Sequence, residues 1–539
     1  MTVNPTHVTG ANLIAGEEHQ AGATTFVAHN PTTGEPGKLR FHEASPAEVS
    51  RATAAAAAAF AITKTYSSAR LAEILEAVAV EVEALGQLLL DTAREETGLG
   101  LERLEGERAR TCGQFRAFAA LLKEGSYVEA IIDTADAPGQ PRHPDLRRML
   151  FPIGPVAVFG SSNFPLAFSV PGGDTASALA AGCPVVVKAH PSHPATSELC
   201  AQAILKALRA TDAAPGTFSM LQGNSVQVGQ QLVQAPEIKA VGFTGSFGAG
   251  RALFDLAAAR AEPIPVYAEM GSVNPLFVLP SALEARGGEI AEGLVASITM
   301  GAGQFCTKPG LVFVVDGEPG RAFAGRVAEL AGRQATGPLL NQGIYDRLTR
   351  QLDHTLGLPG VEVLTGGPST GGVGLVCPET VLTTTADVFL ATPELVDEHF
   401  GPVAVIVRCR SVEQMVEVAS RMQGNLTATL HATDADDDKA AALQSVLQEK
   451  VGRLIWNGYP TGVAVVAAMH HGGPYPASTF PQHTSVGATS IKRFQRPVAF
   501  QNLPDRALPQ ALNDANPLGI LRLVNGSWTR DSVVRRGDS

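Results

Sequence analysis

Hydrophobic residues recur along the chain with two different spacings. Between residues 46 and 123 they lie three and four positions apart and alanine is frequent, which predicts a series of amphipathic helices that includes 102–123. From residue 156 onwards, short apolar runs alternate with alanine-rich segments. The runs predict strands at 156–159, 185–187, 218–221, 240–243, 276–278, 312–315 and 403–407, and the intervening segments predict helices at 174–181, 195–210 and 248–260.

Apolar strands that alternate with helices predict a parallel sheet with helices on both faces. Ligands bind such sheets at the carboxyl ends of the strands, so residues directly after the apolar runs are candidates for function. Two segments depart from this pattern. Residues 137–144 contain three prolines and a glycine and predict a surface excursion, and the polar tail from Asn525 predicts loose order.

The composition narrows the class of protein. A chain of 539 residues has room for two or three lobes, and 45% hydrophobic against 17% charged residues is typical of a globular protein. The net charge of −11 argues against nucleic-acid binding, which needs a basic surface. The N-terminus lacks the pattern of a secretory signal and no run of about 20 apolar residues predicts a membrane span, so we expect a cytoplasmic protein.

Six cysteines are scattered without CxxC pairs or clustered histidines, which predicts neither disulfides nor a metal site. Cys306 differs from the others because it lies among small residues, in Gly-Ala-Gly-Gln-Phe-Cys-Thr-Lys-Pro-Gly at 301–310, directly before an apolar run. Small neighbours leave room for a substrate beside the thiol. Cys306 is therefore the candidate nucleophile, and the other five are expected to be buried, reduced thiols.

Two polar residues follow apolar runs, and each has two interpretations. Asn163 lies in a turn of small residues, where its amide either bonds the turn backbone or donates to a developing oxyanion. Glu269 follows the apolar residues at 266–268. It is either a surface or capping carboxylate, or a base in an apolar pocket whose pKa is raised by desolvation.

Two segments have features of an anion or dinucleotide site. Lys188 directly follows an apolar run and is either a surface lysine or a cation aimed at a ligand. The segment Phe-Thr-Gly-Ser at 243–246 leads from a predicted strand through a glycine turn into a helix. Backbone N–H groups at a helix start favour a pyrophosphate, and glycine lets the ligand come close, although the spacing is not GxGxxG.

Together and in this order, these segments resemble the aldehyde dehydrogenase superfamily over roughly residues 25–490. Five elements carry the resemblance: Asn-Phe-Pro at 163–165, Phe-Thr-Gly-Ser at 243–246, Glu-Met-Gly-Ser-Val-Asn-Pro at 269–275, Gly-Gln-Phe-Cys-Thr at 303–307 and Glu-His-Phe-Gly-Pro at 398–402. The resemblance implies an α/β fold with a Rossmann-type parallel-sheet cofactor lobe, an α/β catalytic lobe and a small bridging element. The corresponding residues are 1–125 and 146–267, then 268–485, then 126–145 and 486–539 with the tail.

The resemblance also implies roles for individual residues. Cys306 is the nucleophile, Glu269 the general base and Asn163 the oxyanion donor, in the oxidation of a small aldehyde to an acid through a thioester. A retained Glu269 favours hydrolysis of the thioester over its transfer to coenzyme A. The resemblance further implies a homo-oligomer, either a dimer or a tetramer. The implied cofactor contacts are Phe159, Lys188, His190, Ser192, Gly223, Phe243, Gly245, Ser246, Gly250, Glu398 and Phe400.

One departure from the family concerns the cofactor. Many members carry a glutamate shortly after the strand lysine, where it accepts hydrogen bonds from the adenosine ribose and repels a 2′-phosphate. Here no carboxylate occurs between Lys188 and Glu198, and His190 and Ser192 offer donors. We therefore expect a preference for NADP, with NAD as the alternative.

Other departures point to a branch of the family. Ser161-Ser162 and Met270-Gly-Ser-Val resemble the 2,5-dioxovalerate (α-ketoglutarate semialdehyde) dehydrogenases and an NADP-dependent bacterial long-chain aldehyde dehydrogenase. The first substrate hypothesis is 2,5-dioxopentanoate, and the alternatives are an aliphatic aldehyde or a catalytically inactive structural protein. A carboxylated substrate favours a guanidinium near the pocket. The candidate substrate residues are Phe164, Phe168, Arg110 and Arg116, although solvated helix positions remain the alternative for both arginines.

Overall fold

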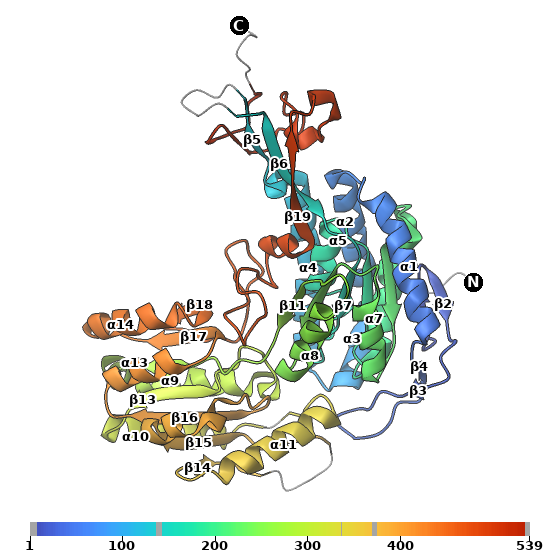
Figure 1. Cartoon of the computed structure of the whole chain (residues 1–539). Coiled ribbons are helices and arrows are strands. Elements are labelled where there is room, and N and C mark those ends of the chain that lie inside the picture. Colours follow the sequence, from blue (N-terminus) through green and yellow to red (C-terminus); the bar gives the residue numbers. More distant parts are fainter. Residues whose placement is uncertain (1–7, 136–142, 336, 369–373, 534–539) are drawn as a thin grey trace.

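The computed structural model describes residues 8–135, 143–335, 337–368 and 374–533. Two seven-stranded sheets each form the centre of an α/β lobe, and a five-stranded sheet extends away from both lobes (Figure 1). The predicted α/β class is thereby confirmed. Within the described ranges, no helix combines the length and the apolar character that crossing a membrane requires.

The first sheet has the strand order β11-β10-β7-β8-β9-β1-β2. Its five strands from β11 to β9 are parallel, and the hairpin of β1 and β2 extends one edge in the antiparallel direction. The strand bounds are β1 (Asn12–Ile14), β2 (Glu17–His19), β7 (Val156–Phe159), β8 (Val185–Lys188), β9 (Phe218–Leu221), β10 (Ala240–Thr244) and β11 (Val266–Glu269).

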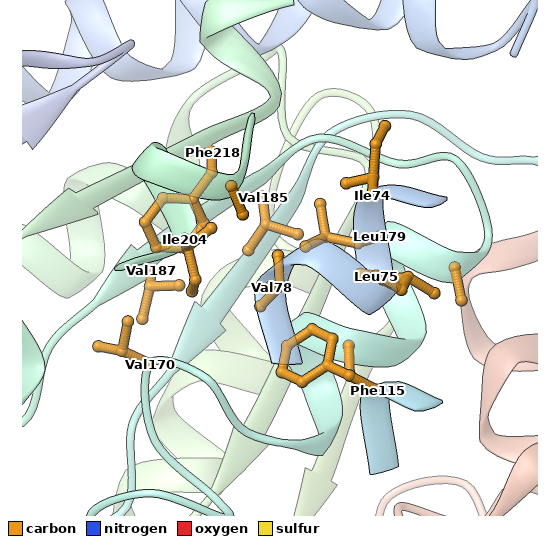
Figure 2. Close-up of a cluster of buried hydrophobic side chains, with 14 of the residues drawn as sticks. Ile74, Leu75, Val78, Phe115, Val170, Leu179, Val185, Val187, Ile204 and Phe218 are labelled. Atoms are coloured by element: carbon orange, nitrogen blue, oxygen red, sulfur yellow. The ribbon is translucent and has the colours of Figure 1, made fainter. Parts of the chain in front are cut away.

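Helices cover both faces of this sheet because successive strand side chains point to opposite sides. Val185 and Val187 pack with α2, α4, α5 and α6, as Figure 2 shows, whereas Val186 faces the core shared with α1 and α7. The helices of this lobe are α1 (Pro46–Thr63), α2 (Ser68–Ala84), α3 (Gly86–Thr97), α4 (Leu101–Glu124), α5 (Gly173–Ala180), α6 (Pro194–Ala210), α7 (Val226–Gln234) and α8 (Phe247–Ala258).

The second sheet has the order β14-β15-β16-β13-β12-β17-β18, with only β14 antiparallel to its neighbour. Helices α9 and α10 pack on one face and α11 to α14 on the other. The bounds are β12 (Leu276–Val278), β13 (Leu311–Val315), β14 (Glu362–Thr365), β15 (Thr380–Thr385), β16 (Val403–Cys409), β17 (Asn425–His431), β18 (Val451–Trp456), α9 (Pro280–Thr299), α10 (Glu318–Ala331), α11 (Gln342–Leu356), α12 (Ala386–Ala391), α13 (Val412–Arg421) and α14 (Asp437–Leu447).

The third sheet combines segments that are far apart in the chain, in the order β19-β6-β5-β20-β21. Its buried Arg147 pairs with Asp145 and Asp514, at 2.9 and 2.6 Å, and so connects β6 to the C-terminal region. The bounds are β5 (Ile131–Asp133), β6 (Leu146–Pro152), β19 (Gln495–Gln501), β20 (Arg522–Val524) and β21 (Ser527–Thr529), and a separate pair joins β3 (Thr25–Phe26) to β4 (Phe41–His42).

Two predicted lobe boundaries are wrong by a few residues. The bridging element was expected to end at 145, but β6 pairs with both β5 and β19 and belongs to the third sheet. The cofactor lobe was expected to end at 267, but β11 continues to Glu269 in the first sheet. Each boundary depends on which strands pair by hydrogen bonds, and the paired strands are separated in the chain.

The predicted strands and helices are confirmed to within one or two residues at each end, apart from the continuous helical pattern at 46–123, which divides into α1 to α4. The expectation of a loosely ordered tail from Asn525 is wrong up to residue 533. Asn525 and Gly526 have φ of 50° and 83° and form the turn between β20 and β21. Residues 137–142 of the predicted surface excursion lie outside the described residues.

Candidate active site

The loop that carries Cys306 has a tightly constrained backbone. It follows α9 through the short helix η3 (Met300–Gly303), where Gly301, Ala302 and Gly303 have φ of 58°, 54° and 69°. A Cβ atom at Gly303 would lie 2.2 Å from the carbonyl carbon of Gly401, so only glycine fits there. The small residues noted around Cys306 therefore serve this close packing.

Asn274 supports the same loop from the other side. Its side-chain amide donates to the carbonyl oxygens of Cys306 and Lys308, at 2.8 and 2.9 Å. The motif at 269–275 thus holds the loop as well as supplying Glu269. This role of Asn274 could not be predicted, because a side-chain to backbone bond across 32 residues leaves no local pattern in the sequence.

Three side chains from distant segments converge at the thiol. Glu269 ends β11, Cys306 precedes β13, and His471 lies in the loop between β18 and the short helix η6 (Ala488–Phe494). The Sγ atom of Cys306 lies 3.6 Å from Nε2 of His471, and this Nε2 lies 3.0 Å from Oε1 of Glu269. The Ser485 hydroxyl donates to Oε2 of Glu269 at 2.8 Å.

The pKa values of the thiol and of the carboxylate in this cluster shift in opposite directions. Burial, followed by the charge of Glu269, raises the pKa of Cys306 well above its ordinary value, so the resting thiol is protonated. Burial also raises the pKa of Glu269, but attraction to His471 and hydrogen bonds from His471, Ser485 and Cys306 outweigh it and lower the pKa overall. The expected desolvation-raised pKa of Glu269 is therefore wrong, because sequence could not reveal these partners.

Asn163 contacts the loop that carries Cys306. It is buried, and its side-chain amide donates to the carbonyl oxygen of Gln304 at 3.0 Å, two residues before Cys306. Arg103 donates to the backbone oxygen of Asn163 at 2.6 Å and holds the turn in place. The amide has a second N–H group, which is available for a substrate oxygen.

Aromatic rings form one wall near the thiol. Phe164 contacts Phe168 and Phe305 edge to face, with ring centroids 5.3 and 5.2 Å apart, and Phe168 lies 6.2 Å from the ring of His471. The predicted pair Phe164 and Phe168 is thus brought to the site. Phe305 was not predicted for this role, although it directly precedes the nucleophile.

Arg110 faces this wall from α4. Its guanidinium lies 5.2 Å from the Phe168 centroid and 5.9 Å from that of Phe164, and its charge reaches Cys306 and Glu269. Its Nε and Nη2 atoms are buried and have no hydrogen-bond partner among the described residues. Two unpaired cationic N–H groups near a thiol suit a carboxylate.

Arg116 does not reach the site, and its prediction as a substrate residue is wrong. It is exposed and pairs with Glu83 through two hydrogen bonds of 2.6 and 2.7 Å. Six helical positions separate Arg116 from Arg110, which places them about 120° apart around the helix axis. Only one of the two can therefore point towards the thiol.

The first sheet presents close approach points at the ends of its strands. A Cβ atom at Gly223, Gly245 or Gly250 would lie 2.7 to 2.9 Å from a neighbouring side chain, so the packing at each position leaves no room for a larger residue. Ser246 begins α8, and its hydroxyl accepts from the amide of Ala249 at 3.4 Å. The predicted Phe159 and Phe243 lie beside these turns, with ring centroids 6.1 Å apart. These features fit the approach of a dinucleotide phosphate to a helix start.

Lys188 ends β8 and has an acidic neighbour that the sequence did not reveal. Glu43 accepts from the amides of Asn224 and Ser225, both at 2.8 Å, and from the Ser225 hydroxyl at 2.6 Å. Burial lowers the pKa of Lys188 to about 8, and the charge of Glu43 opposes that effect. A carboxylate from before α1 thus lies near the lysine.

His190 and Ser192 are engaged with protein groups. The Ser192 amide donates to Nδ1 of His190 at 3.2 Å, and Asn341 donates to the Ser192 hydroxyl oxygen at 3.0 Å. Burial and the charges of His193 and Lys188 lower the pKa of His190 well below its usual range, so its ring is neutral. Lys188 is therefore the one cation among these three residues.

Glu398 and Phe400 lie across the site on the loop before β16. A Cβ atom at Gly271 would lie 2.6 Å from Oε2 of Glu398, which explains the glycine after Met270. Burial raises the pKa of Glu398 to about 7, and the buried Lys308 opposes the shift. Phe400 is partly exposed.

The comparisons with known proteins agree with this geometry. The model of the aldehyde dehydrogenase family matches residues 18–494. Similar proteins include α-ketoglutaric semialdehyde dehydrogenase 2 of Azospirillum brasilense, 46% identical over 96% of this chain and 99% of that protein. The α-ketoglutaric semialdehyde dehydrogenase of Acinetobacter baylyi is 42% identical over 97% of this chain and 99% of that protein.

Solved structures show the same fold. Aldehyde dehydrogenase C from Pseudomonas syringae, determined with NAD+ and octanal, has a TM-score of 0.79 at 22% identity and covers 92% of this chain and 96% of that one. The family match extends over most of the chain and includes Asn163, Glu269 and Cys306. The chain therefore belongs to the aldehyde dehydrogenase family and is an NAD(P)-dependent aldehyde dehydrogenase.

Proposed function

We propose that the protein oxidises 2,5-dioxopentanoate to 2-oxoglutarate. The observation that carries this proposal is the guanidinium of Arg110, whose two buried N–H groups have no partner among the described residues. In an extended 2,5-dioxopentanoate the carboxylate carbon lies about 5 Å from the aldehyde carbon. The charge of Arg110 interacts with Cys306, which supports a carboxylate at Arg110 when the aldehyde lies at the thiol. Relatives at 46% and 42% identity are named for this semialdehyde.

The first half of the reaction needs a thiolate. The thiol of Cys306 gives its proton to the neighbouring pair of His471 and Glu269, and the sulfur attacks the aldehyde carbon. Asn163 donates to the oxygen that becomes negative in the tetrahedral adduct. A bound nicotinamide would supply the hydride acceptor that the oxidation of this adduct to a thioester requires. Lys188, Ser246 and Glu398 are the residues that would hold the dinucleotide.

The second half of the reaction releases the acid from Cys306. The lowered pKa of Glu269 keeps its carboxylate ionised, so it can take a proton from water that attacks the thioester. Ser485 holds one carboxylate oxygen and His471 lies beside the other, which fixes the direction of the base. The aromatic rings of Phe164 and Phe168 pack together, and Phe168 lies 6.2 Å from the ring of His471, so apolar side chains lie beside the reacting groups.

The cofactor preference needs revision. The expected preference for NADP rested on the absence of a carboxylate close to Lys188 in the sequence, and Glu43 removes that premise. Hydrogen bonds from Ser225 and the charge of Lys188 outweigh burial and lower the pKa of Glu43, so it is ionised at neutral pH. We propose that its charge opposes a 2′-phosphate and that NAD is the preferred dinucleotide.

Binding to the free enzyme tests this proposal without turnover. We expect NAD to bind the wild-type protein at least about fivefold more tightly than NADP, and Glu43→Gln to reduce that ratio by improving the affinity for NADP. Isothermal titration with each dinucleotide measures both constants. Tighter binding of NADP to the wild type would return the preference to the one expected from the sequence.

The third sheet supports a further proposal about assembly. It extends away from both lobes, and within the described ranges its outer strands β19 and β21 each pair with a strand on one side only. Free strand edges are sites where another chain can add to a sheet. We therefore propose that residues 495–501 and 527–529 contribute to a homo-oligomer, which sedimentation equilibrium tests against a monomer of 56.1 kDa.

The substrate proposal is tested by a comparison of matched aldehydes. 2,5-Dioxopentanoate, 5-oxopentanoate and pentanal have the same chain length and differ in the keto and carboxylate groups. We expect kcat/KM to be highest for 2,5-dioxopentanoate and at least about 100-fold lower for pentanal, because pentanal leaves Arg110 unpaired. Equal or greater efficiency with pentanal would favour the alternative, an aliphatic aldehyde dehydrogenase.

A further inference from the structure

The side chains of Glu269, Cys306 and His471 form a set of metal-ligand donors. One ligand atom from each, a carboxylate oxygen, a thiol sulfur and an imidazole nitrogen, lies within 4.8 Å of the other two. Cys306 and His471 are 165 residues apart in the chain, so the spacing of cysteines and histidines could not show this group. Oxygen, sulfur and nitrogen donors of this kind are the ones that Zn²⁺ prefers in proteins.

Two of the donor distances lie close to those around a tetrahedral ion, and all three lie within 4.8 Å. With a Zn–S bond of about 2.3 Å and Zn–N and Zn–O bonds of about 2.0 Å, tetrahedral angles place sulfur and nitrogen about 3.6 Å apart and nitrogen and oxygen about 3.3 Å apart. The structure has 3.6 Å between Sγ and Nε2, and 3.0 Å between Nε2 and Oε1. An ion therefore requires only small movements, and three protein ligands leave a fourth position for water.

The surroundings hold two of the ligands in place. Glu269 and His471 are only 4% and 2% exposed. Ser485 donates to the other carboxylate oxygen of Glu269, and the amide of His471 donates to the Thr484 hydroxyl oxygen at 2.8 Å. Such outer contacts orient metal ligands and reduce the cost of ordering them. A cation also neutralises the buried carboxylate and the thiolate that forms when the metal replaces the thiol proton.

Two nearby charges oppose a cation, those of Arg110 and Arg453, and the charge of Arg453 acts on Cys306. Arg110 lies close enough for its charge to act on both Cys306 and Glu269. Both charges limit the affinity, so the site should bind an ion more weakly than a structural zinc site with three or four thiolates. An ion that binds weakly and reversibly can inhibit the thiol and can be removed again by a chelator.

We propose that Glu269, Cys306 and His471 bind Zn²⁺ in the free enzyme and that the bound ion holds the nucleophile inactive. The ion replaces the thiol proton, which is released to solvent, and a Zn–S bond forms without any change of oxidation state. The sulfur lone pair that attacks the aldehyde is then engaged by the metal. A chelator removes the ion, the thiol regains its proton, and activity returns. The proposal does not depend on which aldehyde the enzyme oxidises.

Direct binding to metal-free, cofactor-free enzyme is the first test. Zn²⁺ titrated calorimetrically should bind with one ion per chain and a dissociation constant on the order of 1 μM or below. Co²⁺ in the same site should give a sulfur-to-metal charge-transfer band and the visible bands of a tetrahedral ion. The proposal is overturned if no Zn²⁺ binds at a concentration 100-fold above this dissociation constant, or if the Co²⁺ spectrum shows no sulfur ligation.

Matched variants separate this site from simple reaction of a metal with a thiol. His471→Gln and Glu269→Gln should each weaken Zn²⁺ binding at least about tenfold, and Cys306→Ala should abolish the charge-transfer band. His470→Gln is the control, because this neighbour is not among the three ligands and should leave the affinity unchanged. Circular dichroism and thermal unfolding establish that each variant is folded. Unchanged Zn²⁺ affinity in both His471→Gln and Glu269→Gln contradicts the proposed site.

Discussion

Replacement of Arg110 by methionine should convert the enzyme from a semialdehyde dehydrogenase to one that does not distinguish charged from uncharged aldehydes. Methionine keeps an apolar side chain against Phe164 and Phe168 but removes the two unpaired N–H groups. Each hydrogen bond to a charged group contributes about 1.5–3 kcal/mol. Two such bonds, partly offset by the cost of desolvating the substrate, give about 3–4 kcal/mol, or roughly 10²- to 10³-fold in kcat/KM.

The assay measures kcat/KM for 2,5-dioxopentanoate and for pentanal at the same cofactor concentration. In Arg110→Met the first value should fall by roughly 10²- to 10³-fold, while the second should change less than about threefold. Arg116→Met is the matched control: it removes an arginine from the same helix, but one that pairs with Glu83 at the surface, and both values should stay unchanged. An equal loss for both aldehydes in Arg110→Met would show that Arg110 supports the structure rather than the carboxylate.

Three other predictions concern the catalytic groups and the core. Cys306→Ala should abolish turnover while leaving the fold intact. Cys409→Ala, which changes a buried thiol of the second sheet, should retain turnover. The reverse pattern would refute Cys306 as the nucleophile. Glu269→Gln should give a stoichiometric burst of reduced cofactor and then stall at the thioester, and loss of the burst itself in rapid mixing would show that Glu269 is also needed to activate the thiol. Glu96 accepts from two backbone amides of α6, and burial raises its pKa from 4.5 to about 7. The pKa of Glu96 is higher in the folded state than in the unfolded state, so the free energy of unfolding should fall by about 3 kcal/mol as the pH rises from about 4.5 to about 7. Urea titrations at both pH values should show a smaller fall in Glu96→Gln. The same fall in the variant as in the wild type would remove Glu96 as its cause.

The sequence alone predicts the α/β class, most of the strands and the resemblance to the aldehyde dehydrogenases, which in turn implies catalytic roles for Cys306, Glu269 and Asn163. Strands such as 156–159 and 218–221 were predicted with their observed ends, because a fully buried parallel strand is a short apolar run bounded by turn residues. Cys306 is the candidate nucleophile because small residues surround it in the chain, whereas the role expected for Asn163 follows from the family resemblance. Local signals of this kind survive in a linear sequence.

Which distant groups meet could be learned only from the folded chain. His471 contacts the nucleophile across 165 residues, and Glu43 reaches the surroundings of Lys188 from a segment before α1. Arg110 and Arg116 have the same chemistry and lie on one helix, but the packing of α4 turns only Arg110 towards the thiol. These outcomes depend on the register and the angle at which elements pack, and neither leaves a local pattern in sequence. The charge state of Glu269 follows from the same contacts, so it too could be assigned only from the folded chain.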